Sequence, residues 1–107
     1  MYPSNVPTNA EGFLVDLTDW DPDVAQYLAA QDGITLSREH WAIIIFLRKY
    51  YLQHEKTPGL RALVKHLGVI LDDEAKSNSL YLHQLFPKGP AKQASRIAGL
   101  PKPVRCL

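Results

Sequence analysis

Cysteine is nearly absent from this chain: of its 107 residues, only Cys106 carries a thiol. A single cysteine excludes an intrachain disulfide framework and a zinc site built from several cysteines. The histidines offer no substitute, because His40, His54, His66 and His83 form neither an HxxxH nor an HExxH pattern. We therefore expect no metal and no other cofactor.

Long apolar runs are also absent. The longest strong one, Trp41 to Leu47, is far shorter than the roughly 18 residues that a membrane span needs. The N-terminal segment lacks the basic region and apolar stretch of a secretory signal. With 46% hydrophobic residues and a net charge of +1, the composition fits one small folded domain. We expect a soluble, cytoplasmic protein with no membrane partner.

Acidic residues are missing from the last third of the chain. Residues 1–74 hold all 11 acids and six of the 12 bases, for a net charge of −5. Residues 75–107 hold no acid and six bases, for a net charge of +6. A basic terminal segment is typical of a solvated tail or of a surface that contacts an anionic partner. The only thiol lies in this segment.

Helix start and stop signals recur after residue 20. A capping residue followed by proline occurs at Asp21-Pro22 and at Thr57-Pro58, and Gly89-Pro90 opens a further candidate. Periodic apolar residues follow each of them. We expect five helices: from Asp21 to Gly33, from Ser37 to Leu52, from Thr57 to Gly68, from Ser77 or Asn78 to Pro87, and from Gly89 to Gly99.

Two further expectations concern the arrangement of these elements. The stretch Trp41 to Leu52 is apolar nearly all round, which predicts the central helix of the domain. Short candidate strands, 4–7 and 13–17, flank a polar turn over 8–12 and predict a small β-hairpin. The fold class is therefore mainly α (α+β), with five helices and an N-terminal β-hairpin in residues 1–99.

Residues 100–107 form a predicted C-terminal arm. Pro101 and Pro103 favour extended geometry, so at about 3 Å per residue the thiol could reach roughly 20 Å from the domain. A penultimate cysteine is hard to bury. Lys102 and Arg105 favour its thiolate, while the terminal carboxylate opposes it. A thiol without a partner cysteine suits a group carrier; an incidental exposed cysteine is the alternative.

Residues 57–71 allow another interpretation. Their amphipathic pattern is compatible with one helix of a helix-turn-helix in a nucleic-acid-binding module. A helix that packs in the core produces the same pattern, and we favour that interpretation.

The C-terminal sequence resembles the DsrC/TusE family. The resemblance rests on LFPKGPAKQA over residues 85–94, on RIAGLPKP over 96–103, and on the penultimate Cys106. Further matches are EGFL over 11–14, the segment 33–41, and residues 48–52, so the resemblance covers nearly the whole chain. It implies a small helical fold with an N-terminal hairpin and a mobile C-terminal arm, with sulfur carried on Cys106.

The resemblance also bears on partners. The branch that works with dissimilatory sulfite reductase has a second cysteine eleven residues before the penultimate one, where this chain has Ser95. The single-cysteine pattern is similar to the TusE branch, which takes persulfide sulfur from a TusBCD complex. That branch passes the sulfur to the tRNA 2-thiouridylase MnmA for the wobble uridine. A partner of sulfite reductase or sulfur oxidation is the alternative.

Three basic residues near the arm are candidates for docking. Lys88, Lys92 and Arg96 would face an acidic donor surface or lie near tRNA phosphates. Solvated surface charge is the alternative for each of them.

Overall fold

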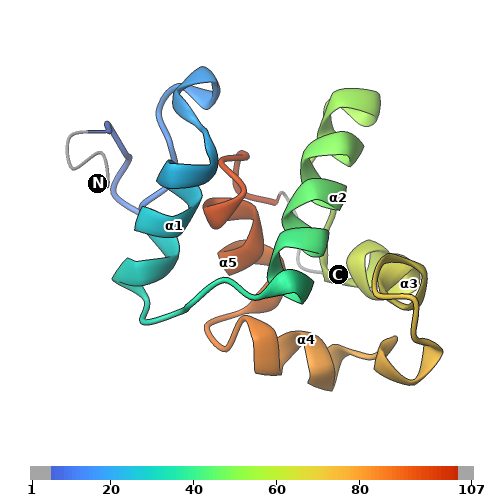
Figure 1. Ribbon diagram of the computed structural model, residues 1–107. Helices are drawn as coiled ribbons and strands as arrows, with labels where there is room; N and C mark the ends of the chain where they lie inside the picture. The colour runs from blue at the N-terminus through green and yellow to red at the C-terminus, as the bar shows by residue number, and fades with distance from the viewer. Residues whose placement is uncertain (1–5, 104–107) are drawn as a thin grey trace.

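The computed structural model describes residues 6–103, which fold into five α-helices and two short 3₁₀ helices (Figure 1). The prediction of a mainly helical domain with five helices is confirmed. In chain order the elements are η1 (Leu17–Asp19), α1 (Pro22–Gln31), α2 (Arg38–His54), α3 (Leu60–Ile70), η2 (Glu74–Lys76), α4 (Ser79–Leu85) and α5 (Pro90–Ile97).

Three helices begin at the side-chain caps that the sequence indicated. The Asp21 carboxylate accepts a hydrogen bond from the amide of Val24 at 2.9 Å and starts α1. Asn78 does the same for α4, accepting from the amide of Tyr81 at 2.8 Å. Ser37 caps α2 in a reciprocal arrangement with His40. These caps satisfy backbone amides that have no partner within the helix.

Helix α3 differs from the prediction at both ends. It begins at Leu60 after an N-cap at Gly59, so Thr57 is not its cap. It also continues through Gly68 to Ile70. Gly68 is buried within the helix, and a Cβ there would lie only 3.1 Å from the Glu74 carboxyl group. This glycine therefore makes room for the turn that follows α3, and it does not end the helix.

The predicted N-terminal β-hairpin is not found in the described residues, which leave out positions 4 and 5 of its first strand. Within residues 6–103 the only β-type pairing is one antiparallel bridge between Thr8 and Leu14. The turn itself forms, because the Asn9 side chain accepts hydrogen bonds from the amides of Glu11 and Phe13. Among the described residues no ladder extends from the bridge, since Pro7 has no amide N–H to donate and Asp16 caps η1 soon after Leu14.

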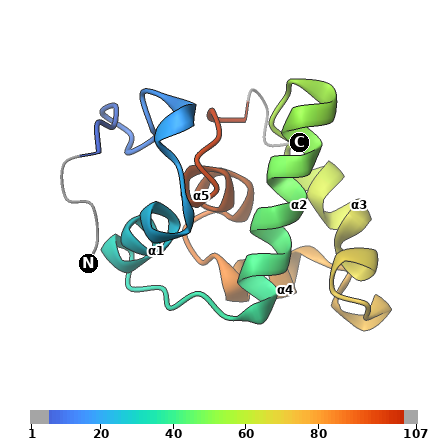
Figure 2. The same cartoon turned by 45° about the horizontal axis from the view of Figure 1, so that its top comes forward.

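The central helix is α5, not the expected α2. Figures 1 and 2 show α5 enclosed by the other helices, and it contacts α1, α2, α3 and α4. Every residue of α5 except Lys92 is buried. In α2, by contrast, Ile45 and Leu52 are 50% and 80% exposed. The small side chains of α5, at Ala91, Ala94 and Ser95, allow neighbouring helices to approach closely on several sides.

One aromatic and one cationic side chain hold the end of α5. The Trp20 indole N–H donates to the carbonyl of Ile97 at 2.9 Å, and the Arg48 guanidinium donates to that of Ala98 at 2.8 Å. The same guanidinium lies 3.9 Å from the Trp20 ring centroid. Gly99 follows with a φ of +74°, so the chain turns sharply against Trp20.

Gly99→Ala should therefore destabilise the domain strongly. A Cβ at this position would lie 2.3 Å from Trp20, and the positive φ adds strain. We expect a loss of about 3 kcal/mol in the free energy of unfolding, measured by urea denaturation. Gly33→Ala is the matched control, because Gly33 has the same φ of +74° but no atom within 4 Å of a new Cβ. Equal losses for the two variants would show that Trp20 does not constrain this turn.

Candidate functional site

The charge division along the sequence is largely neutralised within the fold. Each described basic residue of the last third pairs with a carboxylate between residues 11 and 39. The pairs are Lys76–Glu39, Lys88–Asp32, Lys92–Glu11, Arg96–Asp32 and Lys102–Glu11. Ion pairs thus connect residues far apart in the chain, and two carboxylates, Asp32 and Glu11, pair with four of the five cations.

Asp32, at the end of α1, anchors one face of α5. Its carboxylate accepts a hydrogen bond from the Gln93 side-chain amide at 2.8 Å and pairs with the Arg96 guanidinium. Lys88 lies 3.6 Å away. Partial burial alone would raise the pKa of Asp32, but the Gln93 hydrogen bond and the charges of Arg96 and Lys88 outweigh it and hold that pKa below its usual value.

Arg96 lies inside the domain. The residue is only 9% exposed, and its guanidinium also donates to the carbonyl of Leu28 at 3.2 Å. The sequence analysis predicts that Arg96, like Lys88 and Lys92, docks a partner. The structure uses Arg96 to join α5 to α1 instead, because a buried guanidinium needs its hydrogen-bond partners within the protein. The side chains of Lys88 and Lys92 are 68% and 46% exposed.

Glu11 joins α5 to the start of the predicted arm. Its carboxylate lies 3.1 Å from the Lys92 ammonium and 3.0 Å from that of Lys102. Hydrogen bonds from Lys102 and then Lys92 hold the pKa of Glu11 below its usual range. Glu11 therefore stays ionised, and it connects the N-terminal turn to residues on both sides of Gly99.

The described part of the arm lies against the domain. Leu100 is 3% exposed and belongs to the hydrophobic core. The Thr57 hydroxyl donates to the carbonyl of Pro101 at 2.8 Å, and Pro103 is buried. Two of the predicted site residues, Arg105 and Cys106, lie outside the described residues. What the structure provides is the base of the segment that carries the thiol.

Ser95 lies in the middle of α5 and is fully buried. Its hydroxyl has no hydrogen-bond partner among the described residues, whereas its carbonyl accepts from the amide of Leu100 at 3.0 Å. Ser95 thus lies one turn before the point where the C-terminal segment leaves the helix.

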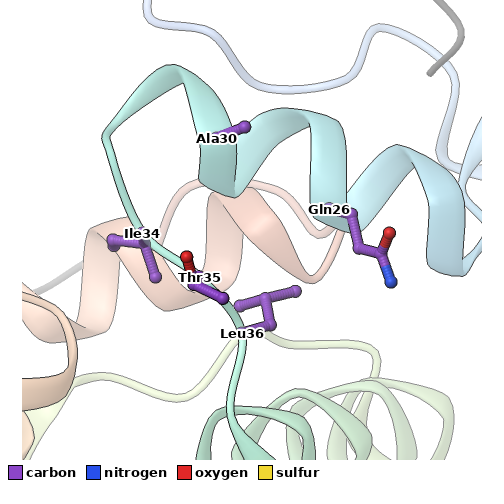
Figure 3. A pocket seen from close by; sticks show the side chains of 5 residues that line it. All are labelled: Gln26, Ala30, Ile34, Thr35 and Leu36. Atoms are coloured by element: carbon purple, nitrogen blue, oxygen red, sulfur yellow. The ribbon is translucent and has the colours of Figure 1, made fainter. Parts of the chain in front are cut away.

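Two of the hollows on the described surface lie beside α1. A cleft of about 160 Å³ over the ion pairs is lined by Glu11, Asp32, Lys88, Lys92, Gln93 and Arg96. A larger one of about 260 Å³ lies between α1 and the loop before α2, with Gln26 as its only lining residue with a long polar side chain (Figure 3). In the part of the chain that the structure describes, no group of His, Cys, Asp and Glu could hold a metal ion. Within that part, no helix has the length and apolar character to cross a bilayer.

Sequence reasoning missed most of the residues that hold this site together. Asp32 lies beside the predicted helix end at Gly33, Thr57 is predicted only to begin a helix, and no sequence pattern indicates a role for Trp20. Glu11 and Arg48 occur in the segments that carry the family resemblance, which is the one signal that pointed to them. Their partners in α5 and in residues 98–102 are distant in sequence, so local patterns could not reveal the pairs.

A model of the family described as "DsrC like protein" matches residues 2–107, and the chain belongs to this family. It is 50% identical over 102 residues to the sulfurtransferase TusE of Salmonella choleraesuis, which covers 95% of this chain and 93% of that relative.

Solved structures agree with the assignment. The NMR structure of Allochromatium vinosum DsrC matches with a TM-score of 0.84 and 51% identity, over 94% of this chain and 88% of that one. The crystal structure of the oxidised gamma-subunit of dissimilatory sulfite reductase from Archaeoglobus fulgidus also gives 0.84, with 42% identity over 95% and 92% of the two chains. The predicted family is confirmed.

Asp32→Asn should lower stability in a pH-dependent way. Because the folded-state pKa of Asp32 is depressed, its contribution is fully present above the unfolded pKa of about 4 and is lost as pH falls through the folded value. We expect a loss of about 2 kcal/mol at neutral pH. Urea denaturation at pH 7 and in acid should show that the gap from wild type narrows in acid.

Asp19→Asn is the control, since Asp19 lies exposed in η1. An Asp32→Asn loss that is equally large at both pH values would contradict an ionic role for Asp32.

Proposed function

We propose that this protein is a sulfurtransferase that accepts sulfane sulfur on Cys106 and passes it to an acceptor protein. The observation that carries the proposal is the 50% identity to a sulfurtransferase over nearly the full chain, in a protein whose only thiol is the penultimate residue. A carrier without a resolving cysteine must give its sulfur to another molecule, which is what a relay requires.

The transfer step is a thiol–persulfide exchange. The Cys106 thiolate attacks the outer sulfur of a donor persulfide; the donor's S–S bond breaks and a new S–S bond forms on Cys106. The donor leaves as a thiolate, and no external oxidant or reductant is consumed. Arg105 would favour the thiolate and the persulfide anion. Lys102 contributes less than its charge suggests, because Glu11 already pairs with it.

The role we propose for the sulfur is 2-thiolation of the tRNA wobble uridine. The donor would be a complex of the TusBCD type and the acceptor a thiouridylase of the MnmA type, close to bound tRNA. Support comes from the relatives named TusE and from the exposed ammonium groups of Lys88 and Lys92 near the base of the thiol segment. Exposed cations of this kind raise encounter rates with an acidic partner.

A partner role with dissimilatory sulfite reductase is the second candidate. It is favoured by the 42% identity to the gamma-subunit of that enzyme from Archaeoglobus fulgidus. Ser95 stands against it, because a hydroxyl cannot form the intramolecular disulfide that the resemblance assigns to that branch. Helix α3 gives no comparable support to a nucleic-acid-binding module, since Leu63 and Leu67 on its apolar face are buried in the core.

Intact-mass spectrometry tests the carrier role. After exposure to a small-molecule persulfide donor, the wild type should gain one sulfur, about 32 Da, and lose it on treatment with a thiol reductant. Cys106→Ser should gain nothing, while Ser95→Ala should load like the wild type. If Cys106→Ser gains the same mass, the sulfur is not carried on this residue and the proposal fails.

Removing two exposed cations should slow transfer from the donor protein only. Lys88→Gln with Lys92→Gln lowers the positive charge beside the thiol segment, so we expect a several-fold lower transfer rate at low salt and a weaker salt dependence. Loading by a small molecule should not change. Lys49→Gln with Lys65→Gln removes the same charge from exposed positions of α2 and α3 and is the control. Equal rates for the two double variants in stopped-flow experiments would exclude docking through Lys88 and Lys92.

A further inference from the structure

Helices α2 and α3 carry the positive charge that the ion pairs of the fold leave over. Residues 40–71 hold five bases and one acid, Glu55, for a net charge of +4, although the stretch 1–74 around them sums to −5. Arg48 contacts the end of α5. The other four bases are exposed, and no carboxylate among the described residues pairs with them: Lys49, Lys56, Arg61 and Lys65. These groups can therefore bind an anion from outside the chain.

A row of aromatic rings lies on the same two helices. Along α2, the ring centroids of Phe46 and Tyr50 are 5.9 Å apart, and those of Tyr50 and His54 are 4.4 Å apart. His66 of α3 continues the row, since its ring centroid lies 5.3 Å from that of Phe46. The row therefore follows the seam where α2 and α3 pack side by side (Figures 1 and 2).

Helix periodicity places cations on both sides of this row. Lys49 is exposed and lies one turn beyond Phe46 on α2. On α3, Lys65 directly precedes His66, and Arg61 lies one turn before Lys65 on the same exposed side. Positive charge thus flanks the aromatic seam from both helices.

We propose that this α2–α3 surface, formed by Lys49, Arg61, Lys65 and the ring row, binds the tRNA that the proposed acceptor thiolates. The inference rests on the proposed function and names the contact that the carrier makes with the RNA. RNA phosphates neutralise the cations, and an unpaired base of a tRNA loop stacks on the exposed ring of His54. An acidic protein surface also offers negative charge but no planar bases, so the ring row favours RNA.

The α2–α3 surface is separate from the cations proposed to meet the donor protein. Lys88 and Lys92 pair with carboxylates at the end of α1 and in the N-terminal turn. Figures 1 and 2 show α1 and that turn on one side of α5, and α2 and α3 on the other. The carrier can therefore contact a protein on one side and tRNA on the other. The surface uses the sides of α2 and α3 that the core leaves open, so it adds to the carrier role and does not make the domain a helix-turn-helix module.

Fluorescence anisotropy with a labelled tRNA transcript that has a wobble uridine tests this surface on the full-length protein. The triple variant Lys49→Gln, Arg61→Gln, Lys65→Gln should bind this tRNA at least about tenfold more weakly at low salt. Three lost phosphate contacts should also reduce the slope of log affinity against log salt by about 2. The thermal midpoint should not change, because the three side chains are exposed and form no ion pair among the described residues.

The matched control removes the same charge from the other side of the molecule. Lys88→Gln, Lys92→Gln and Lys102→Gln together should weaken tRNA binding by less than about threefold, because these cations already pair with Asp32 or Glu11. Equal losses for the two triple variants would show that binding follows net charge alone, and would overturn the proposal. A wild-type protein that binds this tRNA no more tightly than about 100 μM at low salt would overturn it as well.

The ring row separates tRNA from other polyanions. At about pH 8, where free imidazole is uncharged, His54→Ala should weaken tRNA binding about fivefold without changing the salt slope, because stacking releases no counterion. Gln53→Ala, at an exposed neighbouring position, should bind like the wild type. Duplex DNA with as many phosphates should bind at least about threefold more weakly, since its bases are stacked inside. Equal affinity for duplex DNA, or wild-type affinity in His54→Ala, would overturn the assignment to tRNA.

These results are independent of the sulfur chemistry. Persulfide loading of Cys106 requires no tRNA, and tRNA binding requires no persulfide. If loading fails while the binding results hold, the proposed carrier role fails and the RNA surface is retained. If loading succeeds and the triple variant binds tRNA like the wild type, only this inference fails.

Discussion

The enclosure of α5 is the constraint on which the rest of this structure depends. A helix that is buried except at Lys92 and still carries Gln93 and Arg96 needs polar partners in the interior. Asp32 provides them from the end of α1, and Leu28 adds a carbonyl. Because α5 then has a fixed place among the four other helices, the chain that leaves it has a fixed exit beside Trp20 and Arg48.

The same ion pairs change how the separation of charge along the sequence should be interpreted. Along the sequence, the last third carries +6 and the preceding part −5, which suggests a basic surface for partners. In the fold, Asp32 and Glu11 neutralise much of that charge internally. Lys88 has the most exposed side chain among these paired cations, at 68%.

The base of the C-terminal segment combines firm and weak contacts. Leu100 is part of the hydrophobic core, and the turn at Gly99 fits only against Trp20. Beyond it, Pro101 and Lys102 are held by one hydrogen bond and one exposed ion pair.

The sequence by itself determined the family, the five helices and most of their caps, because these depend on local patterns and on a long terminal motif. Predictions from the sequence failed where tertiary contacts decide the structure. In the described residues only one bridge forms where the hairpin was predicted, because Pro7 lacks an amide N–H and Asp16 caps η1. The hydrophobicity of α2 predicted that α2 is the central helix, but α5 takes that place. The small side chains of α5 allow neighbouring helices to approach it closely. Only the tertiary structure brought Asp32 to Arg96 and Glu11 to Lys102, because charges so distant in sequence meet only when the helices pack.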